Sequence, residues 1–202
     1  MSFTAVLTRI YLVITTMFLI GVIAVWFVPR GDISANADRL PAFDLFSFFD
    51  RKTVAYGIFE DRFGNLQRQF RVEIDTNSDG NVLILDERFL YADGEQDRRI
   101  WRIEENIIDG DVIYTGRAED IMGKATGQIV GNTMSWRYEI GLLFSGMEVD
   151  VSFDDFIYQI DNDIAINRAY VSKWGLEIGS VTLVFLKDNL ADQKLPLDLK
   201  NW

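Results

Sequence analysis

The sequence predicts an all-β protein: an up-and-down, antiparallel, lipocalin-like (calycin-type) β-barrel of about ten strands, preceded by one N-terminal transmembrane helix. Three observations lead to this fold class. Apolar and polar residues alternate with period two through most of the chain after residue 53. Turn signals that contain Gly, Asn or Asp separate the alternating runs. Before them, residues 10–29 form a continuous apolar run without a charged residue.

The apolar run is the first predicted element. IYLVITTMFLIGVIAVWFVP extends from Ile10 to Pro29, about the length that a helix needs to cross ~30 Å of hydrocarbon. Arg9 and Arg30 flank it, and Trp26 lies near its second boundary, where interfacial aromatic residues are favoured. A cleaved signal peptide is the alternative, because Ala35-Asn36-Ala37 has the small-x-small cleavage pattern. The run exceeds the usual apolar core of such a signal, so we expect an uncleaved anchor.

Arginines lie on both sides of the anchor, so the distribution of positive charge does not decide its orientation. The segment before it is short and the domain after it is acidic. A signal anchor of this kind places the following domain outside the cytoplasm, and we expect that orientation here.

The strands are predicted from the alternation itself. Phe70, Val72 and Ile74 alternate with polar residues in one run, and Trp136 and Tyr138 do so in another. The expected strands are Thr53–Glu60, Leu66–Asp75, Val82–Tyr91, Arg98–Glu105, Val112–Ala118, Lys124–Val130, Thr133–Leu143, Met147–Tyr158, Ile164–Ser172 and Leu176–Leu186.

A long meander leaves two exposed edges unless it closes on itself, and for this reason we expect a barrel. Pro29, Pro41 and Pro196 all lie outside the expected strands, so every strand keeps its hydrogen-bond donors. A two-sheet sandwich is the alternative. One short helix is expected at Ala42–Phe49. The predicted organisation is an anchor (1–30), a linker (31–45), the β-barrel domain (46–187) and a C-terminal tail (188–202).

The composition excludes several kinds of function. The 202 residues include 20 Lys and Arg against 31 Asp and Glu, a net charge of −11, and no His or Cys. An acidic surface repels phosphate backbones, so we expect no nucleic-acid partner. Without His and Cys the chain lacks Ser-His-Asp and Cys-His nucleophile systems and the usual ligands of zinc, haem and iron–sulfur clusters. We expect no cofactor and no enzyme activity, although paired carboxylates leave acid–base catalysis open in principle.

A short acidic segment resembles a calcium-binding loop. Asp75, Asn77 and Asp79 have the spacing D-x-N-x-D-G, in which alternate side chains converge on one ion. The flanking segments are expected strands rather than helices, and Leu83 and Asp86 stand where the loop needs ligands at its ninth and twelfth positions. We therefore expect a hairpin turn and no metal, with calcium as the alternative.

Charged residues within the strands predict a polar interior. Asp155 shares a face with Val151 and Phe153, and Arg168 shares a face with neighbouring apolar residues on the next strand. An Asp155–Arg168 pair inside the barrel would be either a structural tie or a ligand anchor. Glu87 also shares a face with apolar residues. The candidate ligand-binding residues are Glu87, Tyr91, Trp101, Trp136, Asp155, Asn167 and Arg168.

Several phrases identify a resemblance to a known family. The segments FFDRKTVAYGIFEDRFGNLQRQFRVEI, LDERFLYADGEQDRRIWRI, YTGRAEDIMGKATGQIVGNTMSWRY, VSFDDF and NRAYVSKWGLEIGSVTLVF resemble the bacterial domain-of-unknown-function family numbered 3833, over Phe46–Phe185. The resemblance implies a small bacterial envelope protein, in many members with a lipoprotein-type signal, and an association with gene sets for fatty-acid modification. This chain has no Cys and so departs from that signal. We expect attachment to the bacterial inner membrane, with the soluble domain in the periplasm.

The leading functional hypothesis is a membrane-anchored barrel that binds a hydrophobic or lipid-like ligand, such as a lipid or fatty-acid derivative, at the bacterial envelope. An eight- to ten-stranded barrel is about the size at which the interior holds one small ligand. The alternative is a structural or interaction module with a solid barrel and an acidic docking surface, whose internal charges brace the fold. A lipid-acting enzyme is the third hypothesis.

Overall fold

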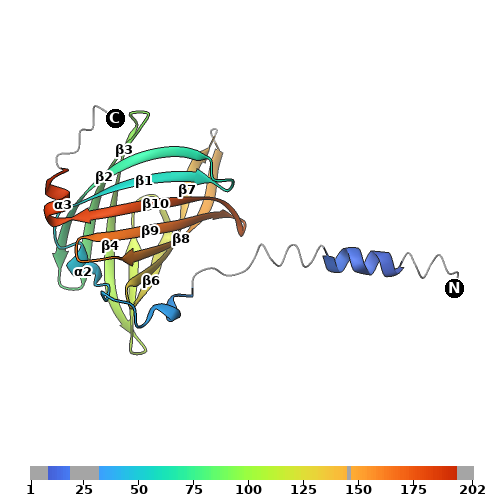
Figure 1. The fold of residues 1–202 in the computed structure, drawn as a ribbon, viewed down its shortest axis with the longest axis horizontal. Helices are drawn as coiled ribbons and strands as arrows, with labels where there is room; N and C mark the ends of the chain where they lie inside the picture. Colours follow the sequence, from blue (N-terminus) through green and yellow to red (C-terminus); the bar gives the residue numbers. More distant parts are fainter. Residues whose placement is uncertain (1–8, 19–31, 145–146, 195–202) are drawn as a thin grey trace.

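The computed structural model, which describes residues 9–18, 32–144 and 147–194, is dominated by a closed, all-antiparallel β-barrel (Figure 1). This confirms the predicted barrel and rules out the two-sheet sandwich. The strands are β1 (Thr53–Asp61), β2 (Leu66–Asp79), β3 (Val82–Tyr91), β4 (Gln96–Ile108), β5 (Asp111–Arg117), β6 (Ile121–Val130), β7 (Thr133–Phe144), β8 (Met147–Gln159), β9 (Ile164–Lys173) and β10 (Leu176–Lys187).

The topology is up-and-down. Every strand pairs with its neighbours in the sequence, and β1 closes the sheet by pairing with β10, with Thr53 opposite Lys187 and Asp61 opposite Gly179. The β5–β6 seam is short, because its register runs only from Tyr114–Gly127 to Gly116–Ala125. Closure removes both free edges of the meander, as the absence of Pro from the strands allows.

The strands begin and end close to the predicted residues, and the main differences lie at the hairpin tips. β2 continues to Asp79 and β4 extends from Gln96 to Ile108, both longer than the alternation indicates. In the β2–β3 hairpin the ladder continues through Asn77–Ile84 to Asp79–Val82. The apolar pattern stops where a hairpin enters solvent, whereas the backbone hydrogen bonds of its ladder continue beyond that point.

Two of the tight turns have both central residues in the left-handed region. Asp109 and Gly110 have φ values of 54° and 93°, and Trp174 and Gly175 have values of 53° and 77°. A two-residue hairpin loop of this shape matches the twist of the strands and favours Asn, Asp or Gly at both positions. Trp174 is therefore the exceptional residue of the two turns, and its side chain is 85% exposed.

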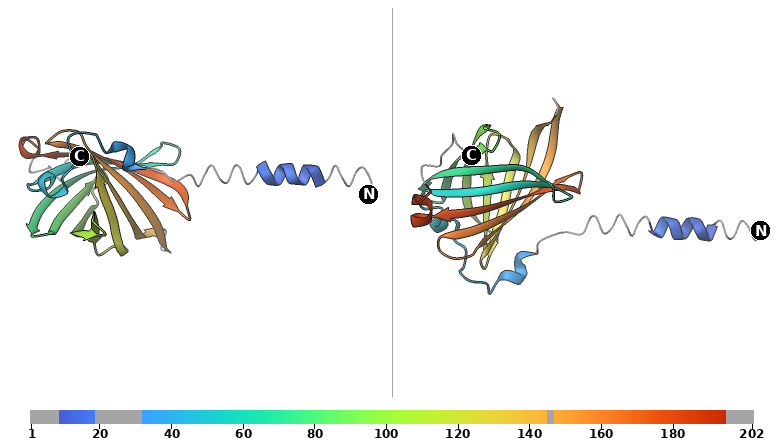
Figure 2. Two further views of the ribbon diagram at one scale, coloured as in Figure 1. Left: turned by 90° about the horizontal axis from the view of Figure 1, so that it is seen from below. Right: turned by 45° about the horizontal axis from the view of Figure 1, so that its top comes forward.

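Short helices lie at one end of the barrel, which we call the closed end (Figures 1 and 2). A 3₁₀ helix, η1 (Ile33–Asn36), packs near the β6–β7 turn, and α3 (Asp188–Asp192) follows β10. α2 (Leu45–Phe48) is shorter than the predicted helix. Neither η1 nor α3 was expected from the sequence, because each spans little more than one turn.

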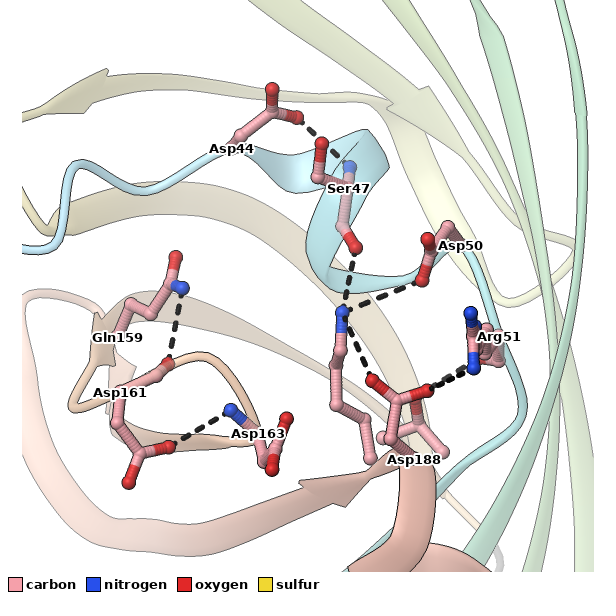
Figure 3. Close-up of polar contacts among 10 residues, drawn as sticks. Asp44, Ser47, Asp50, Arg51, Gln159, Asp161, Asp163 and Asp188 are labelled. Atoms are coloured by element: carbon pink, nitrogen blue, oxygen red, sulfur yellow. Dashed lines mark hydrogen bonds and ion pairs between the residues drawn. The ribbon is translucent and has the colours of Figure 1, made fainter.

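α2 closes this end of the barrel. Phe48 and Phe49 are almost completely buried, and the Phe49 ring packs edge-on against Phe185 of β10, with 5.6 Å between the ring centroids. The Asp44 carboxylate caps α2 by accepting the Ser47 backbone N–H at 2.9 Å (Figure 3).

A buried cation attaches the same helix to the wall. The Lys187 ammonium group of β10 donates to the Ser47 carbonyl at 2.9 Å and lies 3.4 Å from the Asp50 carboxylate. Lys187 is 8% exposed, so this attachment is shielded from water. Arg51, just after α2, pairs with Asp188 at 3.0 Å (Figure 3).

The N-terminal segment is described in part. Residues 9–18 are helical, whereas the remainder of the predicted anchor lies outside the described residues. Among the helices that the structure describes, none has both the length and the apolar character needed to cross a membrane.

Candidate functional site

The barrel is hollow. Its interior holds a cavity of about 750 Å³, within the range of small-molecule binding sites (roughly 300–1,000 Å³). Leu45 and Phe49 border the cavity at the closed end. At the other end, which we call the mouth, its border includes Arg68, Asp97 and Lys173. The cavity therefore runs along the barrel from α2 to the mouth.

The strands are positioned so that their inward side chains make most of this wall apolar. Trp101 of β4 and Trp136 of β7 meet edge-on, with 5.6 Å between ring centroids, and Trp101 meets Tyr138 in the same way at 5.3 Å. These rings bring β4 and β7 together across the barrel. Apolar residues lining the cavity toward the closed end are Leu45, Phe49, Ile74, Leu85, Ile103, Met134, Ile157 and Phe185.

Two glycines make room for this packing. A Cβ atom on Gly116 would lie 2.4 Å from the Trp136 ring, and one on Gly127 would lie 2.6 Å from it. The indole therefore lies directly against the backbone of β5 and β6. Trp136 fills the β5–β6 side of the barrel and leaves the open space between the remaining strands.

Polar side chains interrupt the apolar wall about halfway along it. We call Glu87, Tyr138, Asp155 and Asn167 the polar belt; they come from β3, β7, β8 and β9 and all border the cavity. Asp155 Oδ2 accepts hydrogen bonds from the Tyr138 hydroxyl at 3.4 Å and from Asn167 Nδ2 at 3.3 Å. The belt therefore consists of three linked groups and, apart from them, Glu87.

The polar belt contains unsatisfied acceptors. Asp155 and Asn167 are 7% and 5% exposed, and Oδ1 of each has no hydrogen-bond partner among the described residues. Buried polar atoms are normally paired, so an exception indicates a bound molecule, a water or a functional role. The two Oδ1 atoms are buried in the wall beside the cavity rather than exposed to its open space.

Burial changes the protonation of the belt. It raises the pKa of Glu87 to about 7 and that of Asp155 to about 7, because each charged form loses its hydration. For Glu87, the positive charge of Arg99 partly opposes this effect; for Asp155, the hydrogen bonds from Asn167 and Tyr138 do so. Burial also raises the pKa of Tyr138, which stays a neutral donor. Both carboxyl groups therefore titrate near neutral pH.

Two arginines that border the cavity, Arg99 and Arg68, are paired with acids. Arg99 of β4 borders the cavity and pairs with Asp120 of the β5–β6 turn through Nε at 3.0 Å and Nη2 at 2.5 Å. Arg68 lies over the Tyr91 ring, 3.6 Å from its centroid, and pairs with carboxylates of the β3–β4 turn. These contacts fix both guanidinium groups at the cavity wall.

Most of the predicted ligand-binding residues lie together in this cavity. Glu87 faces inward as the alternation predicts, and Asn167 faces inward beside Asp155. The predicted residues that border the cavity are Glu87, Tyr91, Trp101, Trp136, Asp155 and Asn167.

The predicted position of Arg168 inside the barrel is wrong. It lies on the outer face of β9, where Nη1 donates to Thr182 Oγ1 at 2.6 Å and the Glu60 carboxylate lies 3.6 Å away. The predicted Asp155–Arg168 pair inside the barrel is therefore wrong.

The reason is that β9 is apolar on both faces. Ile164, Ile166 and Tyr170 lie on its less buried outer face, while the small residues Ala165 and Ala169 are buried on its inner face. The alternation rule assigned the face with the larger apolar residues to the interior, whereas the face with the small residues is the inner one.

Arg99 and Tyr138 also border the cavity, although neither is among the residues predicted to bind a ligand. The signal for both is the period-two rule. Arg99 stands two residues before Trp101 and Tyr138 stands two residues after Trp136, so each shares the inward face of its tryptophan.

The segment with Asp75, Asn77 and Asp79 forms part of the β2–β3 hairpin, the structure expected for it, and does not form the alternative calcium loop. All three belong to β2 and are paired along β3, so they follow a strand rather than a loop that encloses an ion. The Asp75 carboxylate pairs with Arg88 at 2.7 Å. Within the described residues, no group of three or more Asp, Glu, His or Cys side chains could hold a metal ion.

The sequence was compared with models of known protein families and with curated proteins. A family model described as "Protein of unknown function (DUF3833)" matches residues 22–187, most of the chain, which confirms the resemblance seen in the sequence. No curated protein matches the chain.

Proposed function

We propose that this chain, which belongs to the DUF3833 family of proteins of unknown function, binds one hydrophobic or lipid-like molecule inside its barrel, in a lipocalin-like manner. The observation that carries this proposal is the cavity of about 750 Å³, whose wall is mostly apolar and holds a few converging polar groups. Ligand sites have this combination, in which apolar area supplies affinity and a few polar groups fix orientation.

The outer surface offers less support for the alternative, an acidic docking surface. Many of its acids are paired across neighbouring strands: Asp86 with Arg98 at 2.7 Å and Asp154 with Arg137 at 2.6 Å, for example. Such exposed cross-strand pairs support the sheet without requiring a partner. A barrel built solely as a brace would also have no need of a large internal cavity.

We propose a binding protein rather than an enzyme. Asp155 and Glu87 have the raised pKa values that acid–base catalysis uses, but burial is the main cause of both shifts and needs no catalytic role. Two groups of the described chain donate to Asp155: the Tyr138 hydroxyl and the Asn167 amide. They orient its carboxyl group and do not activate a nucleophile. A binding role uses every feature of the cavity without an added reaction step.

We also propose that the apolar run of residues 10–29 anchors the protein in the bacterial inner membrane, with the barrel in the periplasm. The run is uncharged and long enough to cross a bilayer. In the part that the structure describes, its apolar side chains from Ile10 to Phe18 are each at least half exposed. A lipid environment would cover them, and the tether would keep the cavity close to a source of lipid.

The test is to isolate the full-length protein from bacterial membranes and examine it by native mass spectrometry and by lipid extraction. We expect one bound molecule per barrel. Ala169→Trp should abolish binding, because Ala169 borders the cavity and an indole there would occupy the space. Ile107→Trp, at a position 77% exposed on the β4–β5 hairpin, is the matched control and should retain the ligand. A folded wild-type barrel that binds no apolar molecule would refute the proposal.

A further inference from the structure

We propose that two hairpin tips at the mouth of the barrel dock on the surface of a phospholipid bilayer. They are the β1–β2 tip (residues 62–66) and the β9–β10 tip (residues 173–176), and we call them the apolar tips. The inference concerns the outer rim of the barrel and so goes beyond the ligand binding proposed above. It is carried by two exposed aromatic residues, each with a cation beside it.

The apolar tips hold the most exposed aromatic side chains of the barrel. Phe63 is 79% exposed and Trp174 is 85% exposed, whereas the other aromatic side chains described between residues 32 and 194 are buried or half-buried. Leu66 and Leu176 are exposed beside them. Large apolar side chains that gather on a protein surface mark an interaction site.

The two tips form one surface. β1 pairs with β10 as far as Asp61, opposite Gly179, and the Arg62 backbone N–H then donates to the Ile178 carbonyl at 3.0 Å. Figures 1 and 2 show the tips next to each other, where β1 ends and β10 begins. Ile178 is exposed and also borders the cavity, so the apolar surface of the tips continues into the barrel.

Trp174 is held at its tip at a cost to the backbone. Its φ of 53° lies in the left-handed region, where Asn or Gly is accommodated more easily than a bulky residue. Because the indole is exposed, packing in the core does not account for a tryptophan at this position. Strained residues of this kind are concentrated at functional positions. The exposed indole therefore indicates a contact outside the chain.

A cation accompanies each of the two rings. Arg62 Cζ lies 5.2 Å from the centroid of the Phe63 ring, and Lys173 Nζ lies 4.5 Å from that of Trp174. Residues 62–66 and 173–176 include no acid, although the whole chain has a net charge of −11. A ring beside a cation suits the boundary between water and lipid, where the ring enters the head-group region and the cation meets phosphate. This complementarity identifies a phospholipid surface as the partner.

The acid at the base of the β1–β2 tip is engaged within the turn. Asp61 Oδ1 accepts the backbone N–H groups of Phe63 at 2.9 Å and of Asn65 at 3.0 Å. These hydrogen bonds hold the carboxylate at the base of the tip while Phe63 projects into solvent. Glu177, which follows the β9–β10 tip, is half-buried. The exposed part of the surface is therefore apolar and cationic.

The β4–β5 tip (residues 107–112), at the opposite end of the barrel, provides a comparison. Ile107, Ile108 and Val112 are exposed there, but Asp109 and Asp111 stand among them and the tip has no cation. Phosphate groups would repel these acids. We therefore expect the β4–β5 tip to stay in water, which makes it a control with similar apolar exposure.

The experiment measures which end of the barrel touches lipid. The chain has no Cys, so a single introduced cysteine carries a unique label. Full-length Gln67→Cys and Ile107→Cys, each labelled with the fluorophore NBD, are reconstituted into phosphatidylethanolamine–phosphatidylglycerol vesicles that contain a nitroxide-labelled phospholipid. Residue 67 adjoins the β1–β2 tip, and residue 107 is on the β4–β5 tip. We expect quenching and a blue-shifted emission at residue 67 and neither at residue 107.

Variants in the Gln67→Cys background identify the groups that dock. Phe63→Ser and Trp174→Asn should each lower the equilibrium constant for docking roughly tenfold, because each removes a large apolar side chain from the interface. Arg62→Gln combined with Lys173→Gln should also weaken docking, since both cations are lost. Ile108→Ser is the matched control and should leave the quenching unchanged. Circular dichroism verifies that each variant is folded.

The outcomes decide the proposal. A label at residue 67 that stays in water would overturn it and assign the apolar tips to a protein partner. Equal quenching at residues 67 and 107 would also overturn it, as would quenching at residue 67 that survives both Phe63→Ser and Trp174→Asn, because the barrel would then be near lipid without docking through these tips. Ligand binding is measured separately by native mass spectrometry, so either proposal can fail while the other stands.

Discussion

Tyr138 and Asp155 are joined across the β7–β8 hairpin by a hydrogen bond of 3.4 Å from the tyrosine hydroxyl to Asp155 Oδ2. Their strands are adjacent, and Asp155 is directly opposite Trp136 in the register. Tyr138 and Asn167 both donate to Oδ2 of the carboxyl group, and the buried Oδ1 has no hydrogen-bond partner among the described residues. This arrangement orients an acid inside an apolar wall, and the first two predictions concern it.

Replacing Asp155 should change the pH dependence of stability. The pKa of Asp155 is about 7 in the folded protein, above the value of about 4 for a carboxyl group in an unfolded chain. The native state therefore binds a proton more tightly, and this contribution to stability is fully present below about pH 4 and is lost as the pH rises through 7. Asp155→Asn should match wild type at pH 4 and exceed it at pH 8 by about 4 kcal/mol.

Urea unfolding followed by circular dichroism at pH 4, 6 and 8 measures this difference. The control is Asp154→Asn, whose carboxylate is in an exposed pair with Arg137 and should shift stability by less than about 1 kcal/mol at any of these pH values. A variant Asp155→Asn that is less stable than wild type at pH 8 would show that the carboxylate is a required brace.

Tyr138→Phe should raise the pKa of Asp155 above about 7. The tyrosine hydroxyl donates to the carboxylate and so favours its charged form; its removal leaves Asn167 as the remaining donor. The measurement is the ¹³C shift of the Asp155 carboxyl group as a function of pH. Tyr158→Phe is the control, because Tyr158 follows the inward-facing Ile157 and lies on the other face of β8. An unchanged titration of Asp155 in Tyr138→Phe would contradict the hydrogen bond.

Trp174→Asn should stabilise the fold. Trp174 has a φ of 53° in the β9–β10 turn, where Asn is accommodated at lower cost than a bulky residue. We expect a gain of about 1 kcal/mol in the free energy of unfolding. Asp109→Asn, at the equivalent position of the β4–β5 turn, should change little. Loss of stability in Trp174→Asn would mean that the exposed indole makes a contact that outweighs the backbone strain.

Gly116→Ala should destabilise the barrel by about 1–3 kcal/mol, because the added methyl group would overlap the Trp136 ring. The double variant Gly116→Ala with Trp136→Leu tests the cause by removing the indole. Thermal unfolding should show a smaller effect of Gly116→Ala when residue 136 is Leu than when it is Trp. Equal effects in both backgrounds would place the origin of the destabilisation elsewhere than at Trp136.

The barrel could be predicted from the sequence because its signals are local. Alternation identifies strands, and residues such as Gly110 and Gly175 identify turns; a meander of this length then has one economical way to satisfy its edges. The same rule placed Glu87 on the inner face, since its neighbours two residues away are strongly apolar and inward. Local pattern was sufficient wherever one face of a strand was clearly the apolar face.

It was insufficient where both faces carry apolar residues. On β9 the choice between Arg168 and Asn167 depends on which residues have room inside, and that is decided by neighbouring strands rather than by β9 itself. For the same reason, the sequence could not predict whether the barrel is hollow. Whether a barrel is filled depends on how the large side chains meet, and the contact of Trp136 with Gly116 joins segments that alternation treats separately.

The position of α2 determines the end of the barrel through which a ligand could enter the cavity. Because this helix closes one end and is attached there by buried Lys187, the cavity formed by the described residues extends from that end toward the mouth. Under the proposed function, a ligand would enter and leave through the mouth, so the end of the molecule that enters first would leave last. Under the same proposal, two partners that exchange the ligand with this protein would have to reach the mouth one after the other.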